Sequence, residues 1–379
     1  MLLLLLLLDR IPPDCRGESF AFLGVFEVAR VLRRVNRRFA ADCAAWLAGG
    51  EGAHALFRSG IAFQLGLQGC RLRDDLGRRM VEASAENGDP CAEAYCDLEG
   101  WGGRHASDWE RACRTLVDVP TASVARPWAD FLMGYCTSHG YGVTADRAAA
   151  LPFYERASAA GLCVAQNHLA LMHMEGEGGL TRNSARARQL LALSAAQGNC
   201  RARYGLAMHD WNSRLPAFDA GVCLSMFTLS ARQGHDEAQY QLGLFYEMGA
   251  EESRLPLHAD EHKAVAWMQR AAEQGPSEST DWYGLAACVL GRYHEAGVGP
   301  LTPDKCAALK WYLRAAKVGN AEALYLVGGY CLYGYAELEA DPDRAAEFYM
   351  RAADLGHARA ANDLAVLLEL GIEPAEADD

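Results

Sequence analysis

The chain of 379 residues lacks the features that mark several large protein classes. It has 13 cysteines but no Cys-x-x-Cys pair, which argues against the common zinc-binding and redox motifs. Its longest apolar run, residues 1–8, is far shorter than the ~20 residues of a membrane-spanning helix. The run also lacks the basic start and cleavage site of a signal peptide. We therefore expect no membrane association and a cytoplasmic or nuclear location, with reduced cysteines that serve as small apolar residues.

Positive charge is scarce, because 36 lysines and arginines face 49 acidic residues and the net charge is −13. A protein held on nucleic acid mainly by phosphate contacts has a basic face, so we expect no nucleic-acid partner. Residues 1–50 differ, with seven arginines against five acids, or +2, which leaves −15 for the remainder. Five of these arginines lie in residues 30–38 and form either a solvated helix face or a patch for an acidic partner.

A glycine recurs along the chain at spacings of 37, 36, 41, 44 and 37 residues. The glycines are Gly161, Gly198, Gly234, Gly275, Gly319 and Gly356. Gly88 lies 73 residues before the first of them, which places one divergent unit around residues 90–127. A glycine that closes a helix commonly adopts the left-handed conformation, so each is predicted to end a helix.

The residues around each glycine keep the same register. Large residues stand eight and seven positions before it, as at Trp267 and Trp311, and small ones four and three positions before it. An apolar residue followed by a small one stands eight and nine positions after it, as in the pairs that end at Gly243 and Gly328. The pattern predicts one helix on each side of the glycine, with small residues where neighbouring helices cross closely.

These units predict an all-α fold of about seven helix-turn-helix repeats of about 36 residues each, preceded by a short N-terminal helical segment. No single unit can bury its own apolar face, so the units must stack. We expect four parts: a helical segment at 1–50, divergent repeats at 51–124, regular repeats at 125–372 and an acidic tail at 373–379.

Segments such as DEAQYQLGLFYEMG (236–249) and KAVAWMQRAAEQG (263–275) resemble Sel1-like repeats, which are relatives of tetratricopeptide repeats. The resemblance covers residues 125–379 well and 54–124 weakly. It implies a right-handed α-solenoid that is not an enzyme and acts as an adaptor, binding other proteins on its surface. A secreted branch of the family joins its helices by disulfides. Here Cys136 and Cys331 share one register, as do Cys163 and Cys200, so we interpret them as packing positions.

Residues 11–46 are similar to an F-box, with a Pro-Asp start, RRVNRRF at 33–39 and a later Trp46. The resemblance implies an apolar surface that binds the adaptor subunit of an SCF-type ubiquitin ligase, while the repeats select substrates. That surface would comprise Phe22, Leu23, Val28 and Val35. The segment departs from the family at residues 16–18, where aliphatic residues are expected. In the alternative, the protein is a stand-alone scaffold and residues 1–50 cover the first apolar face of the stack.

Catalytic patterns are weak, and we predict no catalytic residue, cofactor or metal site. His258 and His262 match an HxxEH string, but the register starts a helix near Asp260, which places His258 in a loop. Residues 176–179, Gly-Glu-Gly-Gly, lack the strand and the Gly-Lys of a phosphate loop. Three tryptophans outside the register are candidates to line a binding groove, namely Trp101, Trp109 and Trp211.

Overall fold

The structure is a computed structural model that describes residues 50–65, 74–101, 107–213, 219–274, 282–372 and 374. These residues contain 17 α-helices and no β-strand, which confirms the predicted all-α solenoid. None of these helices is both long enough and apolar enough to span a bilayer. The chain forms two compact units, Met1–Phe218 and Asp219–Asp379. The boundaries at 50 and 124, which follow repeat regularity, stay predictions.

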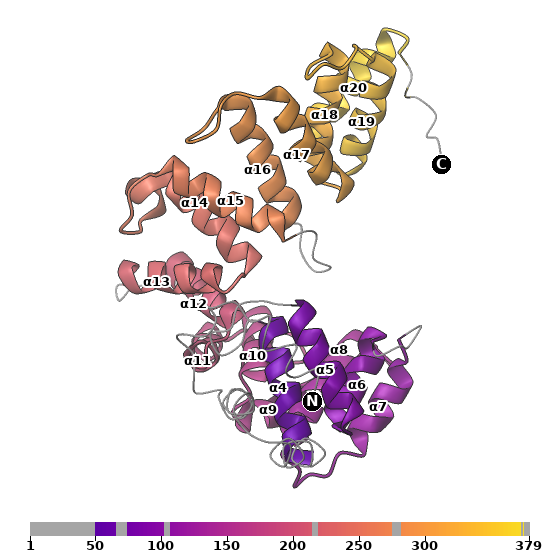
Figure 1. The fold of residues 1–379 in the computed structure, drawn as a ribbon, viewed down its shortest axis with the longest axis vertical. Coiled ribbons are helices and arrows are strands. Elements are labelled where there is room, and N and C mark those ends of the chain that lie inside the picture. The colour runs from indigo at the N-terminus through magenta and orange to yellow at the C-terminus, as the bar shows by residue number, and fades with distance from the viewer. Residues whose placement is uncertain are drawn as a thin grey trace, which may run out of the picture. The chain divides into compact units, whose positions relative to one another are not determined.

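In the described part of the first unit, each helix packs on the next one along the chain (Figure 1). The divergent region predicted around residues 90–127 holds two short helices, α6 and α7, and the start of α8. The helices are α4 (Gly50–Leu65), α5 (Asp74–Glu86), α6 (Pro90–Glu99), α7 (Trp109–Val117), α8 (Arg126–His139), α9 (Arg147–Ala159), α10 (Cys163–Glu175), α11 (Ser184–Ala196) and α12 (Cys200–Ser213).

The second unit repeats the same packing of consecutive helices. Its α14 is two helical segments joined at Gly249, whose φ of 74° is not helical. The helices are α13 (Ala220–Arg232), α14 (Asp236–Ser253), α15 (Glu261–Glu273), α16 (Trp282–Ala296), α17 (Lys305–Lys317), α18 (Ala321–Tyr333), α19 (Pro342–Asp354) and α20 (Ala358–Glu369).

Short polar side chains start most of these helices. The side-chain oxygen of an N-cap Asp or Asn accepts a hydrogen bond from a backbone N–H in the first turn, which the helix itself leaves unpaired. This bond forms at Asp89, Asp108, Asp146, Asn183, Asp219, Asp260, Asp304, Asn320 and Asp341. Because Asp260 caps α15, His258 lies in the preceding loop, as the register predicts.

The recurring glycines follow the helix ends with φ values between 79° and 99°. They are Gly161, Gly198, Gly234, Gly319 and Gly356, while Gly275 lies outside the described residues. A Cβ atom added at Gly161, Gly319 or Gly356 would meet no atom within 4 Å. The requirement for glycine there is therefore the left-handed backbone and not a lack of space.

The small residues inside the helices receive a large side chain from the next helix. A Cβ at Gly328 would lie 2.5 Å from Tyr349 Cε1, and one at Gly291 would lie 2.5 Å from Tyr312 Cδ1. At Gly243, Met268 takes the place of the tyrosine, with Cε 3.0 Å from such a Cβ. The large residue seven positions before the closing glycine thus fills a hole in its neighbour. Trp267 and Trp311, one position earlier, are only half-buried.

Each unit has its own apolar core, and cysteines form part of both. No disulfide joins the ten described cysteines, and all but Cys306 are buried. Burial raises the pKa values of Cys163 and Cys200 to about 11, so both are neutral thiols at physiological pH. The Ser194 hydroxyl donates to the Cys163 carbonyl oxygen at 2.7 Å and fastens α11 to α10.

Candidate functional site

One group of residues in the first unit has chemically reactive side chains. His54, Asp89 and Cys91 come from α4 and the start of α6, and their ligand-type atoms lie within 4.8 Å of one another. The Asp89 carboxylate also caps α6, and its Oδ2 lies 2.9 Å from His54 Nδ1. All three side chains are buried, and burial raises the pKa of the Cys91 thiol well above its usual range. The cluster therefore holds an inert thiol out of reach of a substrate, and its hydrogen bonds join two helices.

A second group of side chains in the first unit is exposed and aromatic. It comprises Trp109 of α7, Tyr135 and His139 of α8, and Tyr141 of the loop after α8, and we call it the aromatic surface. The Trp109 and Tyr141 ring centroids are 4.9 Å apart. His139 stacks on Tyr141 at 5.7 Å and lies 4.3 Å from Tyr135. Trp109 is 44% exposed, whereas Tyr135 and Tyr141 are half-buried.

His168 of α10 connects this surface to the core. Its ring lies 6.3 Å from Tyr135, stacks on the buried Tyr154 at 5.5 Å and meets Phe131 edge-on at 5.3 Å. Removal from water, helped by the positive charge of Arg201, lowers the pKa of His168 to about 4. His168 is therefore neutral at physiological pH and acts as an aromatic packing residue.

Backbone geometry holds Trp109 and Tyr141 together. Asp108 caps α7, and Trp109 is the first residue of that helix. Gly142 has a φ of 68°, and a Cβ there would lie 2.5 Å from the Trp109 carbonyl carbon, so only glycine allows this approach. The Cys113 thiol donates to the Tyr141 carbonyl oxygen at 3.2 Å and fixes the loop from the other side.

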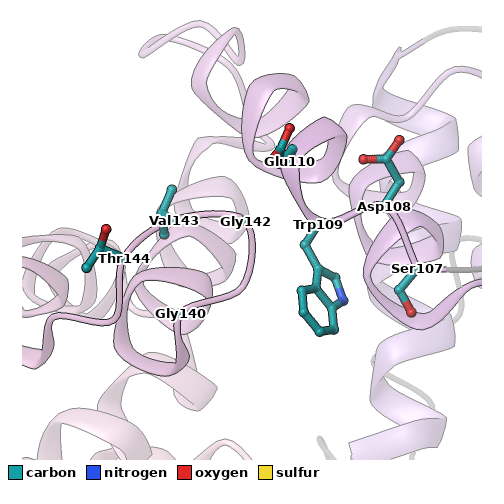
Figure 2. Close-up of a pocket in the computed structure, with 8 residues that line it drawn as sticks. All are labelled: Ser107, Asp108, Trp109, Glu110, Gly140, Gly142, Val143 and Thr144. Atoms are coloured by element: carbon teal, nitrogen blue, oxygen red, sulfur yellow. The ribbon is translucent and has the colours of Figure 1, made fainter.

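A cleft of about 890 Å³ opens beside Trp109. Its lining comes from the start of α7 and from the loop between α8 and α9: Ser107, Asp108, Trp109, Glu110, Gly140, Gly142, Val143 and Thr144. Figure 2 shows the Trp109 indole between Ser107 and the loop that holds Gly140, while the Asp108 and Glu110 carboxylates point away from the indole. The cleft thus combines one exposed aromatic ring, a glycine-lined backbone and an acidic rim.

The predicted groove tryptophans are not gathered in this cleft. Trp109 is one of its lining residues, but Trp101 and Trp211 are not. Trp101 instead packs against Tyr95 at 5.5 Å, under the guanidinium of Arg78. The predicted F-box surface, which comprises Phe22, Leu23, Val28 and Val35, lies outside the described residues.

Sequence reasoning missed most of the aromatic surface. Tyr135 and His139 are four residues apart on one helix, a spacing that places side chains on the same face. Tyr141 follows Gly140, which ends α8 in the left-handed conformation. These local signals predict that the three rings share one region, but the approach of Trp109 depends on the fold.

A model of the Sel1 repeat family matches five segments, at residues 129–162, 163–199, 236–276, 284–320 and 321–357. All five matches end one residue after a glycine of the recurring series, and three of them, at 163, 236 and 321, start two residues after one. The chain is a Sel1-repeat protein. A solved Sel1 repeat protein from Oxalobacter formigenes has the same fold, with a TM-score of 0.55 and 24% identity over 68% of this chain and 96% of that one.

Two fungal proteins are similar in sequence to parts of this Sel1-repeat chain. One is named chitin synthase regulatory factor 3, from Schizosaccharomyces pombe, and is 30% identical over 218 residues, or 55% of this chain. The other is named chitin synthase regulator SKT5, from Malassezia restricta, and is 31% identical over 162 residues, or 42% of this chain. The chain spans only 22% and 10% of their lengths, so the likeness concerns a limited part of each relative.

Proposed function

We propose that the protein is a non-catalytic scaffold that binds segments of partner proteins on its helix surfaces. The observation that carries this proposal is the exposure of the aromatic surface. In the described part of the first unit, most other large rings are buried or half-buried, but Trp109 and His139 are exposed, and Trp109 lines a cleft. Tyrosine and tryptophan are enriched where protein interfaces gain most of their binding energy.

The names of the two fungal relatives support a regulatory form of this scaffold. Both are named as regulators of an enzyme, and each is 30–31% identical to part of this chain. A stack of helix pairs offers a long surface that can hold an enzyme and its activator together. We therefore include an enzyme under regulation among the proposed partners.

The absence of catalysis is part of the proposal. Among the described residues, the His54, Asp89 and Cys91 cluster is the one group that combines a thiol, an imidazole and a carboxylate, and it is buried. The described cysteines form no disulfide and nearly all are buried, which fits a reducing compartment such as the cytoplasm or nucleus.

The proposal is tested by affinity capture with the full-length chain, comparing Trp109→Ala with Tyr333→Ala as the control. Tyr333 lies in the second unit and is 65% exposed, so its removal takes away a ring elsewhere that is more accessible than Trp109. We expect Trp109→Ala to lose most of a defined set of partners in quantitative mass spectrometry and Tyr333→Ala to retain them. Equal recovery by both variants and the unaltered chain would contradict the proposal.

The ubiquitin-ligase form of the proposal rests on the sequence of residues 1–50. In this form Phe22 and Val35 contact the adaptor subunit of the ligase, and the repeats select the substrate. The double variant Phe22→Ala/Val35→Ala is expected to lose co-purification with that subunit while it keeps the other partners. If the unaltered chain does not bind the adaptor subunit, the regulatory scaffold stands alone and residues 1–50 serve as an end cap.

A further inference from the structure

Three other indole rings of this chain each carry an arginine from the chain itself. The guanidinium carbon lies 4.5 to 5.3 Å from the ring centroid in the pairs Arg78–Trp101, Arg270–Trp267 and Arg314–Trp311. Two of the four lysines lie over tyrosines, in the pairs Lys263–Tyr246 and Lys305–Tyr335, and other arginines lie over Phe153 and Phe348. The negative face of an aromatic ring attracts a cation, and these pairs show that arginine is the cation paired with tryptophan here.

Trp109 differs from those three rings. Among the residues that the structure describes, no arginine or lysine lies over its ring, although the ring is 44% exposed. Its Nε1 donates to the Leu98 carbonyl oxygen at 3.3 Å, and Tyr141 packs beside it, so the ring is held in place. The arginines of its own helix make other contacts: Arg111 Nε lies 3.4 Å from Asp97 Oδ2, and Arg114 Nε donates to the Glu110 carbonyl oxygen.

The rim of the cleft is negatively charged. Asp108 and Glu110 flank Trp109 in sequence, and within the described chain neither carboxylate forms an ion pair. Both point away from the indole, so they would attract a cation through space and not by direct contact (Figure 2). Such attraction is modest and is screened by salt over about 8–10 Å. It also offsets the partial positive charge at the start of α7.

We propose that the Trp109 cleft binds an arginine side chain of a partner protein, with the guanidinium stacked on the indole. This inference rests on the proposed scaffold function and adds the chemistry of the bound segment. A guanidinium is planar and weakly hydrated, so it stacks on an indole more readily than a lysine ammonium does. The partner's arginine would occupy at Trp109 the position that Arg78, Arg270 and Arg314 occupy at the other rings.

The test uses the full-length chain labelled with 5-fluorotryptophan, which gives one ¹⁹F signal for each of its eight tryptophans. The Trp109 signal is assigned with Trp109→Phe. N-acetyl-arginine amide is titrated as the probe, with N-acetyl-citrulline amide as a neutral compound of the same shape. We expect a saturable shift of the Trp109 signal with the arginine probe, and at least about two- to five-fold weaker binding of the citrulline probe.

A charge variant separates the contribution of the acidic rim to binding from that of the Trp109 ring. Asp108→Asn keeps an N-cap residue, and with Glu110→Gln it removes both rim charges. The double variant is expected to bind the arginine probe about two- to three-fold more weakly, with less dependence on salt.

Two results would overturn the inference: a Trp109 signal that the arginine probe leaves unmoved, or equal shifts with arginine and citrulline. The proposed function fails separately. If Trp109→Ala loses its partners but the arginine probe is inactive, the scaffold function stands and this ligand chemistry is wrong. If Trp109→Ala keeps all partners, the claim that partners bind at the aromatic surface is wrong.

Discussion

In both units a tyrosine ring packs on a glycine of the preceding helix, but its hydroxyl has a different polar partner in each unit. In the first unit, Tyr154 packs against Gly134, and its hydroxyl lies 3.1 Å from the hydroxyl of Ser138, one turn further along α8. In the second unit, Tyr312 packs against Gly291, and its hydroxyl donates to Glu295 at 2.9 Å, again one turn further along. The glycine accommodates the tyrosine ring, and the residue four positions after the glycine provides the hydrogen-bond partner of the tyrosine hydroxyl.

The units also differ in how they use their remaining rings. In the second unit, the hydroxyls of Tyr293 and Tyr325 donate to carboxylates of neighbouring helices, Glu247 at 2.7 Å and Asp363 at 3.0 Å. In the first unit, Trp109 and His139 are exposed beside a cleft. We infer that the second unit uses several rings to join its helices, although Tyr333 and Tyr335 are exposed there, and that the first unit uses the rings beside its cleft for binding.

The largest effect is expected from filling a glycine hole. Gly328→Ala places a Cβ 2.5 Å from the Tyr349 ring, so we expect it to lower the free energy of unfolding of the second unit by about 2–4 kcal/mol. The adjacent Gly329 provides a matched control, because a Cβ there would meet only the Tyr349 hydroxyl at 3.7 Å. Gly329→Ala should leave stability unchanged or raise it by up to about 1 kcal/mol. Urea denaturation measures the stability of both variants. Equal effects would contradict the claim that Gly328 leaves space for the Tyr349 ring.

A pH effect is expected in the first unit from His168. The folded-state pKa of His168, about 4, lies below the ordinary value of about 6.5, so acidification protonates the unfolded chain first. Its contribution to stability is complete above about pH 6.5 and is lost as the pH falls toward 4. Between pH 7 and pH 5 the free energy of unfolding of the unaltered chain should fall by about 1–2 kcal/mol more than that of His168→Phe. Parallel pH profiles of the two proteins, measured by urea denaturation, would show that His168 is not the responsible group.

Removal of the tyrosine hydroxyls compares the two polar partners directly. Burial and the hydrogen bond to Glu295 raise the pKa of Tyr312, so its neutral hydroxyl is the donor. Hydrogen bonds to charged groups contribute more than neutral ones do. Tyr312→Phe should therefore cost about 1–2 kcal/mol and Tyr154→Phe about 0.5–1 kcal/mol. The reverse order in thermal unfolding would contradict the comparison.

The smallest effect is expected from exchanging N-caps. Leu162 and Asn320 follow equivalent glycines with nearly equal φ and ψ, but only the asparagine side chain accepts a bond, from the Ala323 N–H. Asn320→Leu should cost about 0.5–1 kcal/mol. Leu162→Asn should change stability by less, because the gained cap is offset by lost packing of the partly buried leucine. Thermal unfolding at one protein concentration measures both variants. An Asn320→Leu variant as stable as the unaltered chain would contradict a stabilising role for the Asn320 cap.

The repeat could be predicted from sequence because its chemistry is local. The closing glycines are required by backbone φ, which neighbouring residues determine, and α15 begins after Asp260 as the register predicts. The small residues at Gly243 and Gly328 also mark close crossings, since each receives a large side chain from the next helix. One chain therefore suffices to predict the helix pairs.

The site was less predictable, because it depends on contacts between irregular segments. Trp109 stands outside the repeat register and can be identified from the sequence as a candidate, but no local signal pairs it with Tyr141. Their rings meet only because Gly142 lets the loop approach the start of α7. The half-burial of Trp267 and Trp311 also depends on side-chain contacts, because arginines of their own helices cover the two rings.

The central claim is that partner proteins contact the aromatic surface of the first unit. Site-specific photo-crosslinking tests it most directly, with p-benzoylphenylalanine in place of Trp109 in one full-length protein and of Tyr333 in another. In an extract of the source cells, the account predicts discrete crosslinked partners at position 109 and none of the same partners at position 333. Identical crosslinks at both positions, or crosslinks at 333 alone, would contradict it.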